Sequence, residues 1–478
     1  MRMLPNTRNE FDFDFSTTSS IRWQHGSEAS RDDPVAQSLE YFVNDTRIAE
    51  RFGQTLSPLL ADWIDIALAC YLADRLATRG VGRNGQAGRH WSRVLELTVP
   101  VREVDHWKSK ELQRELAHVL RFLTEDAWNF DFVARSGPLR PAESQGFLFG
   151  SEPGDVVRIC LYSGGLDSFA GAAQLVQKKQ MRRFVFVSGV TNVRQQAAQR
   201  EQIRVLQAMT LGTVHHLVVP YGLRWARTHV HRVEEASQRT RGFLFLTLGG
   251  VSAVAARASE LYLSENGIGA INLPYDGTQI GAYNSRATNP IALLHMERFI
   301  RVLTGQTVGI KNDFLFSTKA EMCAHEAVRG VGDRVGLTFS CDGFPVRTKG
   351  KAQCGTCTSC LFRRQALECA GLSQFDSDGY LRDFSAPGYA GAQKYLDSLR
   401  AMDWQAQKIR FALAQRNPWD ALVSEFVELK RLELELSRSG KMEPSELRSG
   451  LLRLYSRYTS EWESYSARQY CHAEQKVA

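Results

Sequence analysis

The sequence lacks a long uninterrupted apolar run. Its longest apolar stretch, residues 56–76, is broken by Asp62, Asp65 and Asp74. Because three carboxylates are costly inside a bilayer, this stretch predicts a buried or half-buried helix of a soluble protein. The N-terminus also lacks the apolar core of a signal peptide. These absences predict a cytoplasmic protein that binds no membrane, with cysteines that are reduced or metal-bound rather than paired in disulfides.

Internal repeats, low-complexity segments and a strong charge of one sign are also missing. The 59 basic and 52 acidic residues leave a net charge of +7 over 478 residues, and 43% of the residues are hydrophobic. These features argue against a solenoid and against a disordered chain. The modest positive charge permits an anionic ligand but does not indicate direct binding to nucleic acid.

The chain is too long for one ordinary core, so its length predicts two or three domains. We expect an N-terminal α+β accessory domain over residues 1–152, a central domain over residues 153–373 and a C-terminal helical region over residues 374–478. In the C-terminal region, Asn417-Pro418 marks a helix start, and residues 419–434 continue as one amphipathic helix.

The N-terminal part contains both helical and strand-like patterns. Ser57-Pro58 predicts the cap and the first turn of the helix that runs to residue 76. Residues 94–101 and 128–133 alternate between apolar and polar side chains, as strands do, and residues 108–123 carry an apolar stripe at helical spacing.

The middle of the chain alternates between strands and helices. Apolar runs predict strands at residues 156–162, 184–187, 214–219 and 260–263, and helical patterns occupy residues 169–178 and 243–256. This alternation predicts an α/β fold with a doubly wound parallel sheet and helices on both faces. In such sheets, ligands bind at the carboxyl ends of the strands.

A glycine-bearing turn follows the first of these strands. Its residues are Ser163, Gly164, Gly165, Leu166, Asp167 and Ser168. The glycines allow a tight turn with N–H groups close to a ligand, and the helix N-terminus beyond carries partial positive charge, so the turn suits a phosphate. Asp167 suits a helix cap or a partner of Mg²⁺. The string resembles the signature of the PP-loop ATP-pyrophosphatases, which cleave ATP between the α- and β-phosphates.

Two further segments bear on nucleotide binding. Lys319, at a predicted helix start, is our candidate for contacting the β- and γ-phosphates, although an ordinary surface lysine fits the same pattern. Asp167 and Lys319 are therefore the predicted catalytic residues. The GxGxxG match at residues 80–85 follows a helix rather than a strand, so we interpret it as a loop.

Four cysteines are spaced as C-x12-C-x2-C-x2-C. They are Cys341, Cys354, Cys357 and Cys360. Two consecutive x2 spacings place thiolates around one ion, and the first cysteine can complete a tetrahedron. Four thiolates favour a structural zinc site, and an iron–sulfur cluster is the alternative that spacing leaves open.

The turn and the cysteines together resemble the 7-cyano-7-deazaguanine synthase (QueC) family. The final motif of that family has the form SC…CGxCxxCxxR, and Arg363 stands at its arginine. The resemblance covers residues 155–371. It implies a fold of the PP-loop (adenine nucleotide α-hydrolase-like) type and a protein that uses ATP, Mg²⁺ and Zn²⁺. It also implies a C–N ligase that adenylates 7-carboxy-7-deazaguanine with release of pyrophosphate and then AMP.

The chain also departs from these synthases. The Tyr-Gly-Gln element of the family is missing at residues 187–192, and the synthases lack the flanking regions. Extended QueC-like proteins of this build occur in bacterial antiphage systems, such as QatC of the Qat system and the QueC-like component of type IV CBASS. That resemblance implies a role in antiphage defence. It also implies that an amine, either ammonia or the N-terminus of a partner protein from the same operon, captures the deazapurine acyl group.

Four residues are candidates for contacting the substrate. Arg239 and Arg241 precede a predicted helix just past a strand and suit a carboxylate or phosphate, although surface arginines fit equally well. Glu265 and Asn266 follow the strand at residues 260–263, at the sheet edge where a purine-like base would lie.

Two other functions stay open on the sequence alone. One is a PP-loop tRNA-modifying thiolase or amidotransferase, and a thiolase would need a reactive cysteine or cluster beside the turn. The other is a non-catalytic scaffold that binds a nucleotide within a defence complex.

Overall fold

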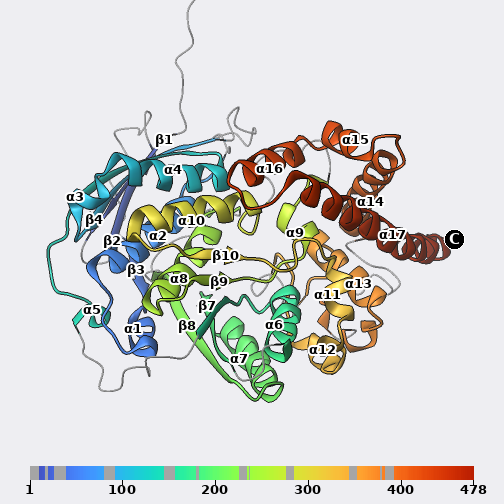
Figure 1. Ribbon diagram of the computed structural model, residues 1–478, viewed down its shortest axis with the longest axis horizontal. Helices are drawn as coiled ribbons and strands as arrows, with labels where there is room; N and C mark the ends of the chain where they lie inside the picture. The colour runs from blue at the N-terminus through green and yellow to red at the C-terminus, as the bar shows by residue number, and fades with distance from the viewer. Residues whose placement is uncertain are drawn as a thin grey trace, which may run out of the picture.

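The computed structural model describes residues 10–16, 20–25, 39–79, 92–144, 157–178, 182–224, 234–235, 237–275, 285–343, 353–376, 379–382 and 392–477. The strands in these ranges form one ten-stranded sheet (Figure 1). They are β1 (Glu10–Phe15), β2 (Ser20–His25), β3 (Leu39–Val43), β4 (Val94–Val101), β5 (Ala127–Ala134), β6 (Val157–Leu161), β7 (Arg183–Val190), β8 (Thr213–Arg224), β9 (Glu260–Tyr262) and β10 (Gly309–Lys311).

The order of the strands is β10-β9-β6-β7-β8-β3-β2-β1-β4-β5. The first five strands in this order are parallel to one another, which confirms the predicted parallel sheet. The others add antiparallel pairs from β8 to β1 and parallel pairs from β1 to β5.

Helices cover both faces of the sheet (Figure 1). They are α1 (Thr46–Phe52), α2 (Pro58–Leu76), α3 (Val104–Trp107), α4 (Lys110–Thr124), α5 (Pro141–Ser144), α6 (Leu166–Lys178), α7 (Val193–Ala208), α8 (Arg241–Ala255), α9 (Gly267–Ile271), α10 (Pro290–Thr304), α11 (Lys319–Ala324), α12 (Glu326–Arg329), α13 (Thr358–Cys369), α14 (Ala392–Leu413), α15 (Pro418–Glu425), α16 (Val427–Arg438) and α17 (Pro444–Val477), with the 3₁₀ helices η2 (Gly332–Leu337) and η3 (Ser373–Phe375). Within the described residues, no helix is long and apolar enough to span a membrane.

Alternate residues of β7 show how the sheet is enclosed. Phe184 and Phe186 belong to a core with α6, α7, α11 and α12, whereas Val185 and Val187 belong to a core with α2, α8 and α10. Because successive strand side chains point to opposite faces, an apolar run buried on both faces needs helices on each side.

The N-terminal strands extend the central sheet. β3 pairs antiparallel with β8, so the sheet crosses the predicted domain boundary at residue 152, which itself lies outside the described residues. Helix α2 begins as predicted, with the Ser57 hydroxyl accepting the Leu60 N–H at 3.4 Å. It packs on α8, where the Trp63 ring lies against Gly250. The predicted strands at residues 94–101 and 128–133 and the helix at 108–123 are confirmed as β4, β5 and α4.

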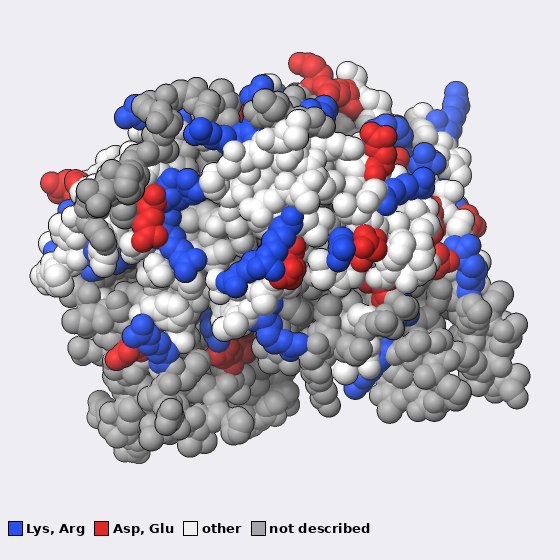
Figure 2. Space-filling view, turned by 90° about the horizontal axis from the view of Figure 1, so that it is seen from below, with Lys and Arg blue, Asp and Glu red and all other residues white. Residues whose placement is uncertain are grey.

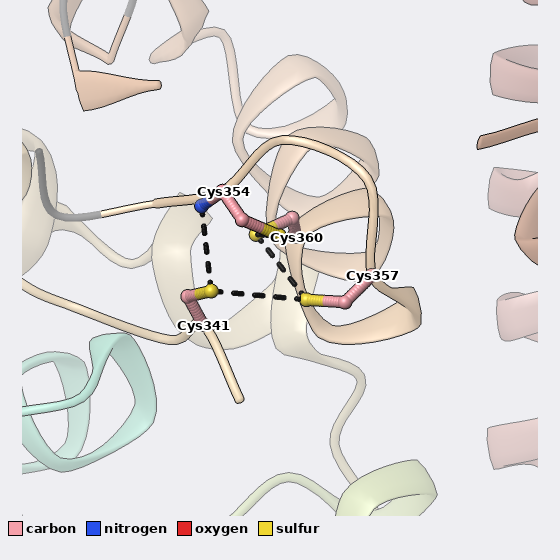
Figure 3. Close-up of side chains that lie close together, drawn as sticks. All are labelled: Cys341, Cys354, Cys357 and Cys360. Carbon is pink, nitrogen blue, oxygen red and sulfur yellow. Dashed lines mark hydrogen bonds between the residues drawn. The ribbon is translucent and has the colours of Figure 1, made fainter. Parts of the chain in front are cut away.

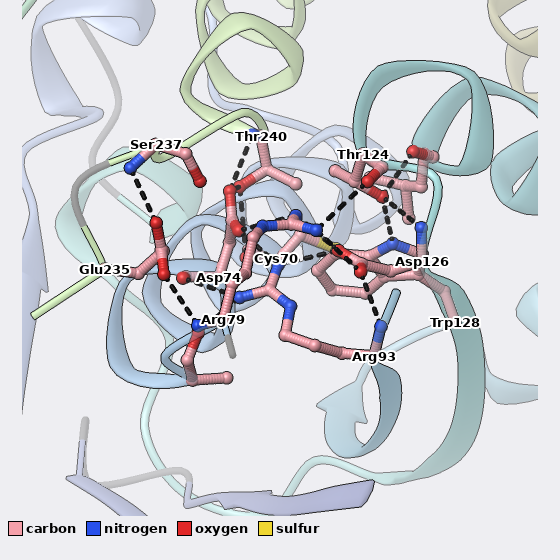
Figure 4. Close-up of polar contacts among 12 residues, drawn as sticks. Cys70, Asp74, Arg79, Arg93, Thr124, Asp126, Trp128, Glu235, Ser237 and Thr240 are labelled. Atoms are coloured by element: carbon pink, nitrogen blue, oxygen red, sulfur yellow. Dashed lines mark hydrogen bonds and ion pairs between the residues drawn. The ribbon is translucent and has the colours of Figure 1, made fainter. Parts of the chain in front are cut away.

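A buried ion network joins what we call the N-terminal layer, the elements from β1 to α5, to α8 (Figure 4). Arg93 donates to Asp74 at 2.5 Å and to Asp126 at 2.6 Å, and Arg79 also pairs with Asp126 at 2.7 Å. The other oxygen of Asp74 accepts the backbone N–H of Thr240 at 2.8 Å and its hydroxyl at 2.9 Å. The carboxylate of Asp74 therefore caps the start of α8 from a different part of the chain.

The C-terminal region is helical, as predicted, but residues 419–434 do not form one helix. The chain leaves helical geometry at Phe426, where φ is −132° and ψ is 85°, so α15 ends and α16 begins there. This bend buries the Phe426 ring and lets Leu422 and Leu429, on either side of it, face the same core. The helix predicted to begin at residue 169 also starts earlier, at Leu166, so half of the glycine-bearing turn belongs to α6.

Candidate active site

The turn from Ser163 to Ser168 connects β6 to α6 at the carboxyl end of the parallel strands. Gly164 has φ of 87°, in the left-handed region that favours glycine. A Cβ atom at this position would lie 2.7 Å from the Phe339 ring and 2.9 Å from the Gln199 side chain. Glycine is therefore required here for both its backbone conformation and its size.

The carbonyl groups of the turn are held by residues that the sequence did not single out. Gln199 donates to Ser163 O at 2.8 Å, Gln202 donates to Gly164 O at 3.1 Å, and the Phe339 N–H donates to Gly164 O at 3.2 Å. With both carbonyl groups bonded in this way, the two peptide planes cannot rotate freely. The signal in the sequence was weak, because glutamine is usually exposed on helices and only the fold shows that these two are buried.

The serine side chains bond within the turn. The hydroxyl groups of Ser163 and Ser168 lie 2.8 Å apart, and Ser163 Oγ accepts the Gly165 N–H at 3.2 Å. Both hydroxyl groups therefore lie at the N-terminus of α6, where its partial positive charge favours an anion.

Four side chains form what we call the buried polar cluster: Asp167, Glu265, Asn266 and Lys319. The Lys319 ammonium forms an ion pair with Asp167, and both side chains are buried. Burial alone would lower the pKa of Lys319, but the charges of Asp167 and Glu265 outweigh it and raise the pKa. The lysine therefore stays positively charged. Its Nζ also lies 5.2 Å from the centre of the Phe362 ring, which favours a cation.

Glu265 is the unusual acid of this cluster. Burial, together with the neighbouring charge of Asp167, raises its pKa to about 8, although Lys319 acts in the opposite direction. Asn266 donates to Asp167 at 3.2 Å and to Glu265 at 3.0 Å, and its side-chain oxygen accepts the Gly269 N–H at 3.0 Å as the cap of α9. The side-chain nitrogen and the side-chain oxygen of Asn266 are thus both hydrogen-bonded within the protein.

The two candidate arginines lie in different surroundings. Arg239 is within electrostatic range of Arg79 and Asp74 of the buried network, and burial together with Arg79 lowers its pKa. Arg241 is the exposed first residue of α8, and its charge acts on the carboxyl group of Asp342, next to Cys341. Of the two, Arg241 is therefore the one whose charge acts beside the cysteine cluster.

The four predicted cysteines do converge (Figure 3). Their sulfur atoms lie within 4.8 Å of one another, with individual separations of 3.4 Å, 3.8 Å and 4.0 Å. Zinc–sulfur bonds of about 2.3 Å in a tetrahedron require sulfur atoms about 3.8 Å apart. The backbone N–H groups of Gly343 and Cys354 also point at Cys341 Sγ, at 3.2 Å and 3.3 Å, as they would towards a thiolate. The site therefore fits one tetrahedral metal ion.

Arg363, the arginine that ends the cysteine motif, is fully buried and organises the same region. It donates to Asp376 at 2.8 Å, to Thr338 Oγ1 at 2.6 Å and to Val335 O at 2.9 Å. The segment just before Cys341 is thus held both by this arginine and, through Phe339, by the glycine-bearing turn. The four-cysteine cluster and the turn are therefore connected through the same segment.

No protein-family model matches this chain, but a known protein is similar to it. Over 240 residues, the chain is 28% identical to a 7-cyano-7-deazaguanine synthase from Novosphingobium aromaticivorans. The match covers 94% of that protein but 46% of this chain. It supports the relation to the synthase family that the motifs suggest, and it leaves more than half of this chain outside the match.

Proposed function

We propose that this protein is an ATP-dependent ligase that adenylates a deazapurine carboxylate similar to 7-carboxy-7-deazaguanine and transfers the acyl group to an amine. The observation that carries the proposal is that Asp167 of the glycine-bearing turn pairs with Lys319, while the Phe339 N–H bonds the same turn to the segment that leads into the four-cysteine site. The similarity to a 7-cyano-7-deazaguanine synthase supports the class of substrate and the use of ATP.

The chemistry has two steps. A carboxylate oxygen of the substrate attacks the α-phosphorus of ATP, and the bond to the bridging oxygen breaks to release pyrophosphate. An amine nitrogen then attacks the acyl carbon, the bond to the AMP oxygen breaks, and the amine loses a proton. Catalysis of the first step requires stabilisation of the negative charge that develops on pyrophosphate.

The residues of the site have matching roles in this proposal. The N–H groups of the turn, the hydroxyl groups of Ser163 and Ser168, and Lys319 would hold the phosphates. Asp167 keeps Lys319 charged and in place, and it could also hold the Mg²⁺ ion that arrives with ATP. Zinc at the four cysteines would hold the segment around Phe339.

Turnover with purified components tests the proposal. With ATP, Mg²⁺ and 7-carboxy-7-deazaguanine, the protein should release AMP and pyrophosphate. Lys319→Ala and Asp167→Asn should each lower the rate about 100-fold or more, because the first removes positive charge at the reacting phosphates and the second removes the partner that holds Lys319 and would bind Mg²⁺. Lys311→Ala is the matched control, since Lys311 is exposed on β10. Binding of ATP without release of AMP for any deazapurine carboxylate would reject the substrate class.

The acceptor in our proposal is ammonia or the N-terminus of a partner protein, in bacterial antiphage defence. This part rests on the resemblance to the extended QueC-like proteins. Intact-mass spectrometry of proteins co-expressed from the same operon should show a deazapurine adduct that disappears with Lys319→Ala. Adduct-free partners together with formation of a free amide would instead identify ammonia as the acceptor.

The thiolase alternative gains no support from the cysteine nearest the candidate lysine. Cys323 lies one helical turn after Lys319, and burial, together with the charge of Asp167, raises its pKa to about 12. A thiol with this pKa is a poor nucleophile at neutral pH.

A further inference from the structure

The C-terminal helix α17 contacts the segments that carry the buried polar cluster. Gly450 packs against the Phe316 ring, and a Cβ atom there would lie 2.5 Å from it. Arg453 donates to Phe316 O at 3.3 Å, and Leu454 Cδ2 would lie 2.6 Å from a Cβ atom at Gly267, the first residue of α9. The helix thus touches the turn before Lys319 and the start of the helix that Asn266 caps.

One carboxylate of α17 reaches further. Thr318 is the N-cap of α11, and its hydroxyl oxygen accepts the Glu321 N–H at 3.1 Å. The single proton of this hydroxyl is donated to Glu461 Oε1 at 3.0 Å. The other oxygen, Glu461 Oε2, lies 3.4 Å from Gln365 Nε2 on α13, the helix that carries Cys360. Glu461 therefore bridges the start of the helix of Lys319 and the helix of the metal site.

We propose that Glu461 is a positioning residue for Lys319 and that α17 is part of the candidate active site. Thr318 is fully buried and directly precedes Lys319, so any rotation of this cap would move the lysine. Without an acceptor at position 461, the buried hydroxyl would lose its bond and would have to reorient. The inference rests on the proposed function only in taking Lys319 as the residue that contacts phosphate.

The electrostatics of Glu461 suggest how to separate its charge from its hydrogen bonds. Burial and, to a smaller extent, Glu321 raise its pKa to about 7, whereas the Thr318 hydrogen bond and Arg457 lower it. The contact with Thr318, which positions Lys319, needs one oxygen acceptor rather than a full negative charge. A glutamine at position 461 therefore keeps what the inference requires, and an alanine removes it.

Accessibility of Lys319 in the protein without ligand is the primary test. We expect an amine-acylating reagent, followed by peptide mass spectrometry, to label Lys319 at least tenfold faster in Glu461→Ala than in the unmodified protein. Glu461→Gln should stay within about twofold. Glu463→Ala is the matched control, because Glu463 lies on the same helix with a side chain 62% exposed. Affinity for ATP, measured by calorimetry, should fall about tenfold in Glu461→Ala alone.

The outcomes separate the two proposals. If the protein binds no ATP, the proposed function fails, and the labelling of Lys319 still decides the inference. Equal labelling in Glu461→Ala and Glu463→Ala would overturn the inference. If Glu461→Ala does not fold, Glu461→Asp takes its place in the experiment. Aspartate keeps the carboxylate, but its side chain is one methylene shorter, so its oxygen atoms lie farther from the Thr318 hydroxyl. Unchanged labelling in that variant would also overturn the inference.

Discussion

At the scale of single residues, the buried polar cluster brings together two acids and one base, of which Asp167 and Lys319 are buried and Glu265 is partly buried. Asp167 and Lys319 neutralise each other, and Glu265 is left as the acid that burial disfavours in its charged form. Such a group is a feature of functional sites, where charge arrangement is selected over stability. The raised pKa of Glu265 should also make the stability of the folded protein depend on pH.

Stability should decrease with rising pH because of Glu265. Its pKa is raised to about 8 in the folded protein, above an unfolded value of about 4.3, so folding favours the protonated form. The stabilising contribution is present below the unfolded pKa and is lost as the pH rises through the folded pKa, by about 1.4 kcal/mol for each pH unit between the two. The glutamine of Glu265→Gln cannot ionise. The free energy of unfolding of this variant, relative to that of the unmodified protein, should therefore rise from pH 5 to pH 8.5. Denaturant unfolding of both proteins at pH 5 and at pH 8.5 measures this change. A difference in unfolding midpoint between the two proteins that is the same at both pH values would contradict the prediction.

At the scale of elements, the glycine-bearing turn depends on helix α7. Gln202 accepts the Tyr162 hydroxyl at 2.6 Å and donates to Gly164 O at 3.1 Å and Leu337 O at 2.8 Å. One side chain thus joins the residue that follows β6, the turn and the segment before the cysteines. No pattern in the sequence marks this residue, since its role exists only when three distant segments meet.

Gln202→Leu should destabilise the protein by about 2–4 kcal/mol, because it leaves several buried polar groups without this partner. Affinity for ATP should also fall, as the turn loses a restraint on its peptide planes. Glu201→Gln, at the exposed neighbouring position on α7, provides the control. A variant with lower stability but unchanged ATP affinity would show that Gln202 supports the fold and not the turn.

The proposed metal site at the four cysteines also connects separate elements of the structure. We expect about one zinc ion for each chain and no visible absorption from an iron–sulfur cluster, as measured by plasma mass spectrometry and spectrophotometry. Cys360→Ser, at the fully buried ligand, should lose the metal and weaken ATP binding through Phe339. Cys369→Ser, at an exposed cysteine of the same helix, should keep both. Full ATP affinity after loss of zinc would contradict the coupling.

At the scale of the whole molecule, one sheet joins the N-terminal layer to the site. Basic and acidic side chains are intermixed on the face that Figure 2 shows. The buried ion network joins α2 to the residues that directly precede β4 and β5, and it ends at Thr240, next to Arg241. Although burial opposes ionisation of Asp74, its pKa is lowered, chiefly by the charge of Arg93. Asp74 therefore stays charged at neutral pH.

Asp74→Asn should destabilise the protein by about 3 kcal/mol, because Arg93 keeps its charge and loses one of its two buried carboxylate partners. The loss should appear in one unfolding transition that includes the central sheet, if the N-terminal layer and the site fold together. Glu40→Gln, in an exposed pair 3.9 Å from Arg224, should change stability by less than about 0.5 kcal/mol. A separate early transition in Asp74→Asn would show that the N-terminal layer unfolds alone.

Local patterns predicted much of this protein. The periodicity of residues 108–123, the Ser57-Pro58 helix start and the alternation of strands with helices are confirmed, because each depends on neighbours a few residues apart. The cysteine spacing predicted a cluster for the same reason, since three of its four ligands lie within seven residues. The roles of Asp167, Lys319, Arg241 and the four cysteines in a reaction stay predictions.

Only the tertiary structure decided how these parts meet. The sheet crosses the expected domain boundary because β3 pairs with β8, and such pairing leaves no local signal in either strand. Gln199, Gln202, Phe339 and Glu461 lie far apart in the sequence from the groups they hold. By itself, the sequence determined which side chains have the chemistry that suits phosphate and metal, because that is a property of residue type and close spacing. Their orientation came from buried hydrogen bonds between distant segments, which exist only in the folded chain.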